Sequence, residues 1–154
     1  MMNYYSCIAN SYDALYGEEQ LKKIKIILQH KLIKKTESIL DVGCGTAVYA
    51  DFFKNYMGID SAKKMLKDSR CVHGCAEHLP FPDKSFDVVI SITAIHNFKD
   101  IDQALKEMKR VMKRKVIISL LKRSSKYITI KEKIKNCFEV TLLDEEKDTI
   151  FVSQ

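Results

Sequence analysis

A short apolar segment that runs into a glycine turn constrains the fold of this chain more than any other feature. Residues 38–47 are Ser-Ile-Leu-Asp-Val-Gly-Cys-Gly-Thr-Ala. This pattern predicts a buried strand at 38–42, a tight turn at 43–45 and the start of a helix at Ala47. In an open α/β sheet, such a turn places backbone N–H groups and the Asp41 carboxylate where nucleotide-like ligands bind.

The rest of the chain alternates between strand and helix patterns. Apolar runs predict further strands at 56–59, 71–73, 86–92 and 116–121. Helical periodicity predicts helices at 19–34, with Leu21, Ile24, Leu28 and Leu32 inward, and at 47–55, 62–68, 100–113 and 124–136. A polar turn between 137–143 and 149–153 predicts a terminal hairpin. This alternation is typical of a parallel sheet with right-handed crossovers.

Length and composition fit one globular domain. The chain has 154 residues, 46% hydrophobic and 30% charged, and no apolar run approaches the ~18 residues that a membrane span needs. Residues 1–6 lack the basic and apolar stretches of a signal peptide. We therefore expect a single cytoplasmic domain, 1–154, away from membranes, with an N-terminal cap segment at 1–18 and a core at 19–154.

The five cysteines do not indicate a disulfide framework, because their number is odd and no Cys-x-x-Cys pair occurs. Cys71, His73, Cys75 and His78 are close in sequence and could suggest a metal site. Structural zinc sites, however, usually combine two-residue spacers with a second ligand pair farther along the chain. We expect no metal.

Positive charge is concentrated in one stretch of the chain. The formal net charge is +6, and residues 106–135 hold twelve lysines and arginines, opposed only by Glu107 and Glu132. We expect the two helices of this stretch, 100–113 and 124–136, to cover the same side of the sheet. Their outer sides then form one basic face, here called the basic face 106–135. Such a face attracts nucleic acid. Two solvated lysine-rich helices explain the same residues equally well.

Three classes of ligand compete for the glycine turn. A Walker-type phosphate loop requires a lysine that is absent after Gly45, and a dinucleotide fingerprint requires a glycine where Val48 stands. S-adenosylmethionine (SAM) requires only that the glycine turn let the backbone come close to the ligand. Asp60 supports an adenosine ligand, because a carboxylate at the end of the second strand can accept both ribose hydroxyls. A structural N-cap role explains Asp60 as well.

Three motifs, in this order and spacing, are together highly specific: Ile-Leu-Asp-Val-Gly-Cys-Gly-Thr at 39–46, Gly-Ile-Asp-Ser at 58–61, and Gly-Cys-Ala-Glu-His-Leu-Pro-Phe-Pro-Asp-Lys-Ser-Phe-Asp at 74–87. With them, the chain from 38 to 112 resembles class I SAM-dependent methyltransferases, most closely the group containing the ubiquinone/menaquinone biosynthesis enzymes. The resemblance implies a Rossmann-like, seven-stranded, mostly parallel sheet with helices on both faces and a C-terminal antiparallel hairpin. It also implies SAM as cofactor and S-adenosylhomocysteine as product.

The resemblance assigns a cofactor site position by position. Gly43 and Gly45 would let the backbone pass close to SAM, and Asp60 would bind the ribose hydroxyls. Asp41 would lie near the methionine amino end, and Met65 could pack on the adenine or belong to the core. The resemblance further places Tyr12 in a segment that closes over SAM, Ala76 and Glu77 by the adenine edge, and Cys44, Ser61 and Ser91 around the cofactor.

Two positions depart from the family pattern. Ala47 replaces the third loop glycine, a change that still permits a tight turn. Cys75 replaces an aspartate that accepts a hydrogen bond from the adenine amino group in the family, and a thiol is a poor acceptor. We therefore expect lower affinity for SAM.

Candidates for contact with the methyl acceptor follow the fourth strand, in Ser-Ile-Thr-Ala-Ile-His-Asn-Phe at 91–98. His96 is the best catalytic candidate because its ordinary pKa lies near neutrality, and Asn97 stands beside it; a capping or packing role for His96 is equally open. The segment resembles a Ser-Ile-Ala-Val-Ile-His-His-Phe run of wobble-uridine tRNA methyltransferases, which pair with a small zinc-binding activator protein. Asn97 replaces the second histidine of that run.

Three functional hypotheses follow. The first is methyl transfer to RNA, above all tRNA, with the basic face 106–135 binding phosphates and an activator protein added to the exposed edge of the third strand. The second is a small-molecule C- or O-methyltransferase of the quinone-biosynthesis type. The third is a non-catalytic scaffold subunit with the fold of a SAM-dependent methyltransferase. The replacement of the family's aspartate by Cys75 is what keeps this hypothesis open.

Overall fold

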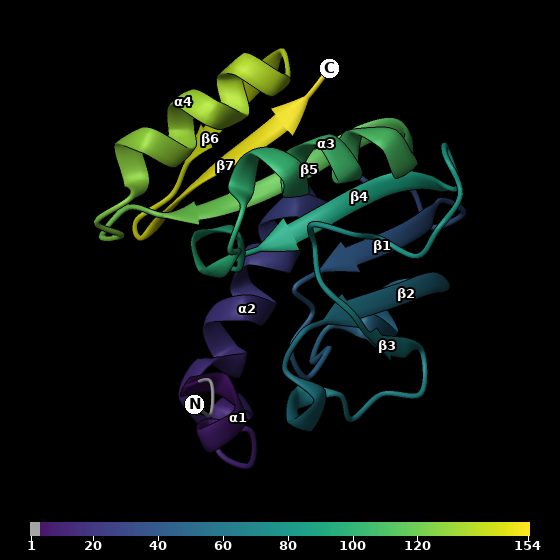
Figure 1. Cartoon of the computed structure of the whole chain (residues 1–154), viewed down its shortest axis with the longest axis vertical. Coiled ribbons are helices and arrows are strands. Elements are labelled where there is room, and N and C mark those ends of the chain that lie inside the picture. Colours follow the sequence, from purple (N-terminus) through teal and green to yellow (C-terminus); the bar gives the residue numbers. More distant parts are fainter. Residues whose placement is uncertain (1–3) are drawn as a thin grey trace.

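The computed structural model describes residues 4–154 as a seven-stranded sheet with helices on both faces (Figure 1). The strand order is β3-β2-β1-β4-β5-β7-β6. The pairs among the first five strands of this order are parallel, whereas β7 runs antiparallel to both β5 and β6. The Rossmann-like fold expected from the sequence, with its antiparallel terminal hairpin, is confirmed.

The elements have the following bounds. The strands are β1 (Ser38–Val42), β2 (Asn55–Asp60), β3 (Cys71–His73), β4 (Phe86–Ile92), β5 (Met112–Leu121), β6 (Val140–Asp144) and β7 (Asp148–Ser153). The α-helices are α1 (Tyr4–Ile8), α2 (Tyr12–Gln29), α3 (Ile101–Val111) and α4 (Tyr127–Cys137). Three short 3-10 helices are η1 (Ala50–Phe52), η2 (Lys63–Met65) and η3 (Ile95–Asn97).

The central strands are apolar without alternation because both of their faces are covered. From Val88 to Ile92 every residue of β4 is buried, and β1 is buried from Ile39 onward. Asp41 in β1 pairs in register with Gly58 of β2 and with Ile90 of β4. The turn that follows β1 therefore lies between the ends of two neighbouring parallel strands.

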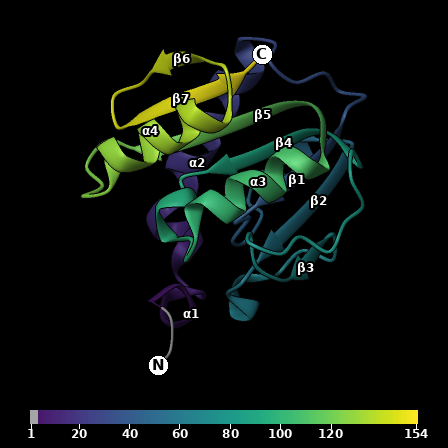
Figure 2. The same cartoon turned by 45° about the horizontal axis from the view of Figure 1, so that its top comes forward.

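Two hydrophobic cores lie on opposite faces of the sheet (Figure 2). One joins α3 and α4 to the sheet, with Leu105, Met108, Ile130 and Ile134 all buried. The other lies under α2, which contributes Ile24 and Ile27. The prediction that α3 and α4 share one face is therefore confirmed, since the two helices also contact each other.

The sequence predicted α3 well. Its N-cap residue Asp100 accepts a hydrogen bond from Gln103 N at 3.0 Å, which satisfies one free N–H group of the first turn. Ala104, Leu105, Met108 and Val111 form the buried stripe.

The helix α2 differs from the prediction of 19–34 in both bounds and buried face. Its buried residues are Gly17, Gln20, Lys23, Ile24 and Ile27, whereas the predicted Leu21 and Leu28 are only partly buried. The buried stripe is rotated because Lys23 has an acidic partner inside the protein, Asp148 at the start of β7.

The helices predicted at 47–55 and 62–68 are reduced to η1 and η2. Ala47 has a φ of +56°, which continues the glycine turn instead of starting a helix. The cap segment 1–18 forms α1 and the beginning of α2, and its residues 1–3 lie outside the described residues. No helix in the described range 4–154 combines the length and apolarity required to cross a membrane.

Candidate functional site

A cavity opens at the carboxyl ends of β1, β2 and β4, where ligands bind in doubly wound sheets. It contains eight of the residues assigned to the cofactor and one of the two assigned to the acceptor. These are Tyr12, Gly43, Gly45, Asp60, Ser61, Met65, Ala76 and Glu77, and then Asn97. Residues from five distant stretches of the chain therefore meet in one place.

The glycine turn needs its glycines for two physical reasons. Gly43 and Gly45 have φ values of +80° and +55°, a region that other residues avoid. A Cβ added to Gly43 would stand 2.5 Å from Ala94 Cβ, so the turn packs directly against the segment after β4. The N–H groups of Gly43 and Cys44 both donate to Ile59 O, at 2.8 and 3.1 Å.

Asp60 connects the two cofactor motifs. Its Oδ2 accepts from Gly45 N and its Oδ1 from Ala62 N, each at 2.8 Å. Burial raises the pKa of Asp60, while these two hydrogen bonds act in the opposite direction. The carboxylate thus has a capping role toward Ala62 and also lines the cavity, so the two explanations drawn from the sequence are compatible. Ser61, expected near the cofactor, lines the cavity beside it.

Asp41 lies behind the turn and not on the cavity wall. It is fully buried, and its Oδ2 accepts a hydrogen bond of 2.6 Å from the Tyr56 hydroxyl. Burial raises the pKa of Asp41 to about 7, although the hydrogen bond from Tyr56 and the nearby Tyr49 hydroxyl oppose the shift. Asp41 Oδ1 has no hydrogen-bond partner among the described residues.

The N-terminal cap segment closes one side of the cavity. Met65 Cε and Tyr12 Cε1 would lie 3.3 and 3.9 Å from a Cβ on Gly45, so both side chains stand over the turn. Asp13, next to Tyr12, accepts a short hydrogen bond from the Thr46 hydroxyl. This contact attaches the start of α2 to the glycine turn.

The first residues of the family-like run at 74–87 line the cavity, and its later residues form a loop that contacts α3. Gly74, Cys75, Ala76 and Glu77 line the cavity. The Glu77 carboxylate accepts from Lys99 N at 2.8 Å and so connects the loop to the start of α3.

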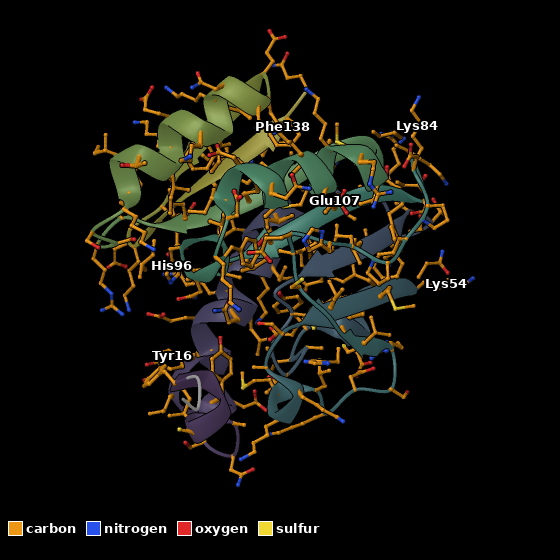
Figure 3. The ribbon with its side chains drawn as sticks, viewed as in Figure 1. Tyr16, Lys54, Lys84, His96, Glu107 and Phe138 are labelled. Atoms are coloured by element: carbon orange, nitrogen blue, oxygen red, sulfur yellow. The ribbon has the colours of Figure 1, made fainter. Side chains whose placement is uncertain are left out.

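Arg110 of α3 fixes the following Leu-Pro-Phe-Pro-Asp segment. It donates to Leu79 O at 3.0 Å, to Phe81 O at 2.8 Å and to Asp83 Oδ1 at 2.8 Å. Glu107, labelled in Figure 3, accepts from Arg110 and from Leu79 N, and the bond from Arg110 lowers its pKa.

Two residues assigned to the cofactor point elsewhere. Ser91 is fully buried and outside the cavity wall, and its hydroxyl has no partner among the described residues. The Cys44 thiol turns toward Cys71 above Gly58, where a Cβ would stand 2.7 and 2.6 Å from the two sulfurs. A hydrogen bond between these thiols raises the pKa of Cys44 and lowers that of Cys71.

The acceptor candidates lie on η3, at the edge of the cavity. His96, labelled in Figure 3, is half-buried, and its Nε2 is 3.2 Å from Asn97 Nδ2. Burial lowers the pKa of His96, an effect that the negative charge of Asp148 opposes. Asn97 lines the cavity, whereas His96 is not among the lining residues.

Sequence reasoning did not assign several lining residues: Ile59, Gly74, Ile92, Thr93, Ala94, Phe98 and Lys99. Most of them follow β4, within or beside the 91–98 segment. Their position after a buried parallel strand was the signal that could have identified them.

Most of the basic face 106–135 is engaged in contacts within the protein. Seven of its twelve cations bind a carboxylate or a backbone carbonyl. Among them, Arg114 pairs with Glu37 and Lys115 donates to Leu32 O, both in the segment before β1. These two cations therefore belong to β5 and its surroundings and not to the helical face.

The cavity residues fit SAM. The two glycines leave the backbone open toward the ligand, and Asp60 presents a carboxylate at the end of β2, where a ribose is bound in this class of sheet. Within residues 4–154, no cluster of three or more His, Cys, Asp or Glu side chains could hold a metal ion.

Comparison with known proteins agrees with this geometry. The methyltransferase domain family matches residues 40–120. An uncharacterized protein of Methanocaldococcus jannaschii is 35% identical over 116 residues, which cover 71% of this chain and 46% of that protein. The demethylmenaquinone methyltransferase of Thermotoga maritima is 34% identical over 149 residues, which cover 83% of this chain and 65% of the enzyme. The chain thus spans between about half and two thirds of the length of these relatives.

Solved structures share the fold. A SAM-dependent methyltransferase from Thermotoga maritima superposes with a TM-score of 0.77 at 18% identity, over 99% of both chains. A methyltransferase of Haloferax volcanii, solved in complex with the Trm112 methyltransferase activator, gives a TM-score of 0.78 at 13% identity over 99% of this chain and 98% of its own. The chain therefore belongs to the methyltransferase domain family, as a class I SAM-dependent member of the menaquinone-like group.

Proposed function

We propose that this protein transfers a methyl group from SAM to a small aromatic acceptor of the quinone-biosynthesis type. The observation that carries the proposal is the cavity wall formed by the end of β4 and the segment after it, where Ile92, Ala94 and Phe98 present apolar side chains. Such a wall suits a flat, uncharged ring. The 34% identity with the Thermotoga maritima demethylmenaquinone methyltransferase supports the same acceptor class.

The residues of this chain would bind the reactants, align them and exclude water from the site. SAM, when bound, supplies a methyl group already activated for in-line displacement. The glycine turn and Asp60 would hold the cofactor in one orientation, and the side chains of Ile92 and Phe98 would exclude water from the acceptor. Alignment of this kind accounts for much of the rate gained in a two-substrate reaction.

His96 is the proposed general base for an acceptor hydroxyl. Because burial lowers its pKa, the imidazole is neutral at pH 7 and can accept a proton. Its Nδ1 is buried and lacks a hydrogen-bond partner within the described part of the chain, so Nε2, which lies 3.2 Å from Asn97 Nδ2, is the ring nitrogen that would take the proton.

The test is transfer of labelled methyl groups from SAM to a reduced demethylated naphthoquinol, with tRNA assayed in parallel. We expect label in the organic extract, and we expect Asp60→Ala to weaken SAM binding by at least about tenfold, since a charge-assisted hydrogen bond is lost. Lys133→Ala, which breaks an ion pair with Asp102 on the helical side, serves as a control with unchanged activity. Label in tRNA alone would overturn the small-molecule proposal.

The second candidate is methylation of RNA with an activator protein. Lys106, Arg123, Lys126 and Lys135 make no side-chain hydrogen bond or ion pair with other residues of the 4–154 range, so these cations are free to bind phosphates. β3 is a short edge strand with Val72 37% exposed, and a small zinc-binding activator could pair with it. This candidate predicts tRNA binding that falls steeply with salt. Label transfer to tRNA only when the activator is present would support it.

A further inference from the structure

Thr93 adopts a backbone conformation that β-branched residues avoid. It follows the last residue of β4 and has a φ of +53°, in the left-handed region where Cβ crowds the following carbonyl oxygen. Such a conformation persists only where surrounding contacts hold it. Because Thr93 also lines the cavity, the contacts that hold it bear directly on the site.

Three elements hold Thr93 in place. Its N–H donates to Ser119 on β5, to Oγ at 2.8 Å and to the carbonyl oxygen at 3.2 Å. Lys23 Nζ on α2 donates to Thr93 Oγ1 at 2.7 Å, and that hydroxyl donates to Asp148 Oδ2 at 3.1 Å. Lys23 and Asp148 also form an ion pair with a separation of 3.1 Å. These four residues make one connected polar network.

The ion pair of this network is buried. The Lys23 side chain is 8% exposed and that of Asp148 is 0% exposed. Among the ion pairs of residues 4–154, this is the only one with both side chains so deeply buried. Desolvation makes such pairs costly compared with apolar residues of similar size, so they are weak contributors to stability. Their position, in contact with a strained residue of the cavity wall, points to a role in the site.

The conformation of Thr93 sets the direction of the acceptor-facing segment 94–98. Immediately after Thr93, Ala94 Cβ packs so closely on the glycine turn that a Cβ at Gly43 would lie 2.5 Å from it. The chain then forms η3, which carries His96 and Asn97. A change of backbone direction at Thr93 would therefore move these residues relative to the cofactor turn.

We propose that the buried Lys23–Asp148 ion pair is a positioning pair for methyl transfer: it holds Thr93 in the left-handed conformation and thereby fixes the segment 94–98 against the glycine turn. This inference rests on the proposed function, since it takes the segment 94–98 as the acceptor side. Neither Lys23 nor Asp148 lines the cavity. Their effect on the backbone of the segment 94–98 is transmitted through Thr93, whereas their charges act on the pKa of His96 in opposite directions.

The test removes the pair and then restores the backbone conformation by another route. In the variant Lys23→Met/Asp148→Asn both charges are absent, and we expect kcat for the naphthoquinol to fall about 10- to 100-fold through misalignment. The Kd for SAM, measured by calorimetry, stays within about threefold, because the cofactor contacts lie across the turn. Adding Thr93→Gly recovers most of the lost kcat, since glycine adopts a positive φ without support.

A control removes another carboxylate–cation pair, before β1, in which the arginine side chain is 48% exposed. Glu37→Gln/Arg114→Met deletes the pair beside β1, and its kcat remains that of the wild type. A merely structural role for Lys23–Asp148 would lower thermal stability without rescue by glycine. An unchanged kcat, or a loss of SAM affinity as large as the loss of kcat, overturns the positioning pair.

A second readout keeps this inference separate from the acceptor class. If the wild type does not methylate the naphthoquinol, the proposed function fails, but the positioning pair is still decided by backbone NMR of the protein with SAM added. We expect the amide and Cα shifts of residues 94–98 to change in the double variant and to return toward the wild type when Thr93→Gly is added. Unchanged shifts in the double variant overturn the pair.

Discussion

The Tyr56 hydroxyl donates a 2.6 Å hydrogen bond to the carboxylate of Asp41, directly behind the glycine turn. Asp41 is fully buried and forms no ion pair with any residue of the range 4–154, so its charged form is disfavoured and its pKa rises to about 7. The carboxylate therefore titrates near physiological pH, close to the cofactor cavity.

This titration makes the stability of the protein depend on pH. The pKa of Asp41 is higher in the folded state than in the unfolded chain, so between pH 4 and 7 the folded state holds the proton more tightly. By linkage, the contribution of Asp41 to the free energy of unfolding falls as pH rises through this window, by up to roughly 4 kcal/mol. Asp41→Asn, which cannot ionise, lacks this contribution. Urea unfolding of both proteins at pH 5 and pH 8 measures it, and equal pH dependence would refute the shifted pKa.

Ala47→Gly should stabilise the protein. Ala47 has a φ of +56°, where an L-residue is strained and glycine is not. We expect a gain of about 0.5–1 kcal/mol in the free energy of unfolding, reduced from the full strain by glycine's greater freedom in the unfolded chain. Ala50→Gly is the control, because Ala50 is also buried but lies in η1 without a positive φ, and it should lose stability. A loss of stability in both variants would contradict this argument.

Gly58→Ala should destabilise the protein by about 1–3 kcal/mol, as overpacking does in a close-packed interior. The new Cβ would stand 2.6 Å from Cys71 Sγ, 2.7 Å from Cys44 Sγ and 2.9 Å from Cys44 Cβ. Gly17→Ala is the contrasting variant in α2. There the Cβ meets its neighbours at an ordinary 3.7 Å, and alanine favours the helix by up to about 1 kcal/mol. Thermal denaturation of the two variants should show shifts of opposite sign.

The rate of methyl transfer should fall on the acid side of neutrality if His96 is the base. Burial lowers the pKa of His96 below its ordinary value of 6.5, so the imidazole is neutral at pH 7 and becomes protonated only at lower pH. We expect kcat/KM to be flat from pH 8 to 7 and to fall below about pH 6.5. His96→Gln should lower the rate by about 10²–10⁴ and abolish this dependence. His30→Gln, at the exposed end of α2, should leave the profile intact; an unaltered profile in His96→Gln would exclude the role.

The sequence was sufficient where the determining interactions are local. Apolar runs located β3 and β4 at their observed bounds, and helical periodicity placed α3 within two residues of its bounds. The glycine turn and Asp60 were recognised because their conformations depend on residues adjacent in the sequence and because each lies at the end of a strand. Eight of the cofactor-site assignments therefore lie in one cavity.

The sequence was insufficient where a distant residue decides the outcome. Lys23 is buried in α2 only because Asp148 is its partner, and a helical pattern counts lysine as exposed. Thr93 is held at its positive φ by contacts with Lys23 and Asp148, which lie 70 and 55 positions away in the sequence. Likewise, seven cations of the basic face 106–135 were counted as free charges, although their partners lie elsewhere in the fold.

The residues that support the cofactor side of the cavity and those that hold the acceptor segment come from different parts of the sequence. The glycine turn, Asp60 and the run at 74–87 all lie within residues 40–120, the part shared with the methyltransferase domain family. Lys23 and Asp148, which hold the acceptor segment, lie outside that part. Changes in α2 and the terminal hairpin can thus alter how the segment 94–98 is held, while the glycine turn and Asp60 of the shared part stay the same.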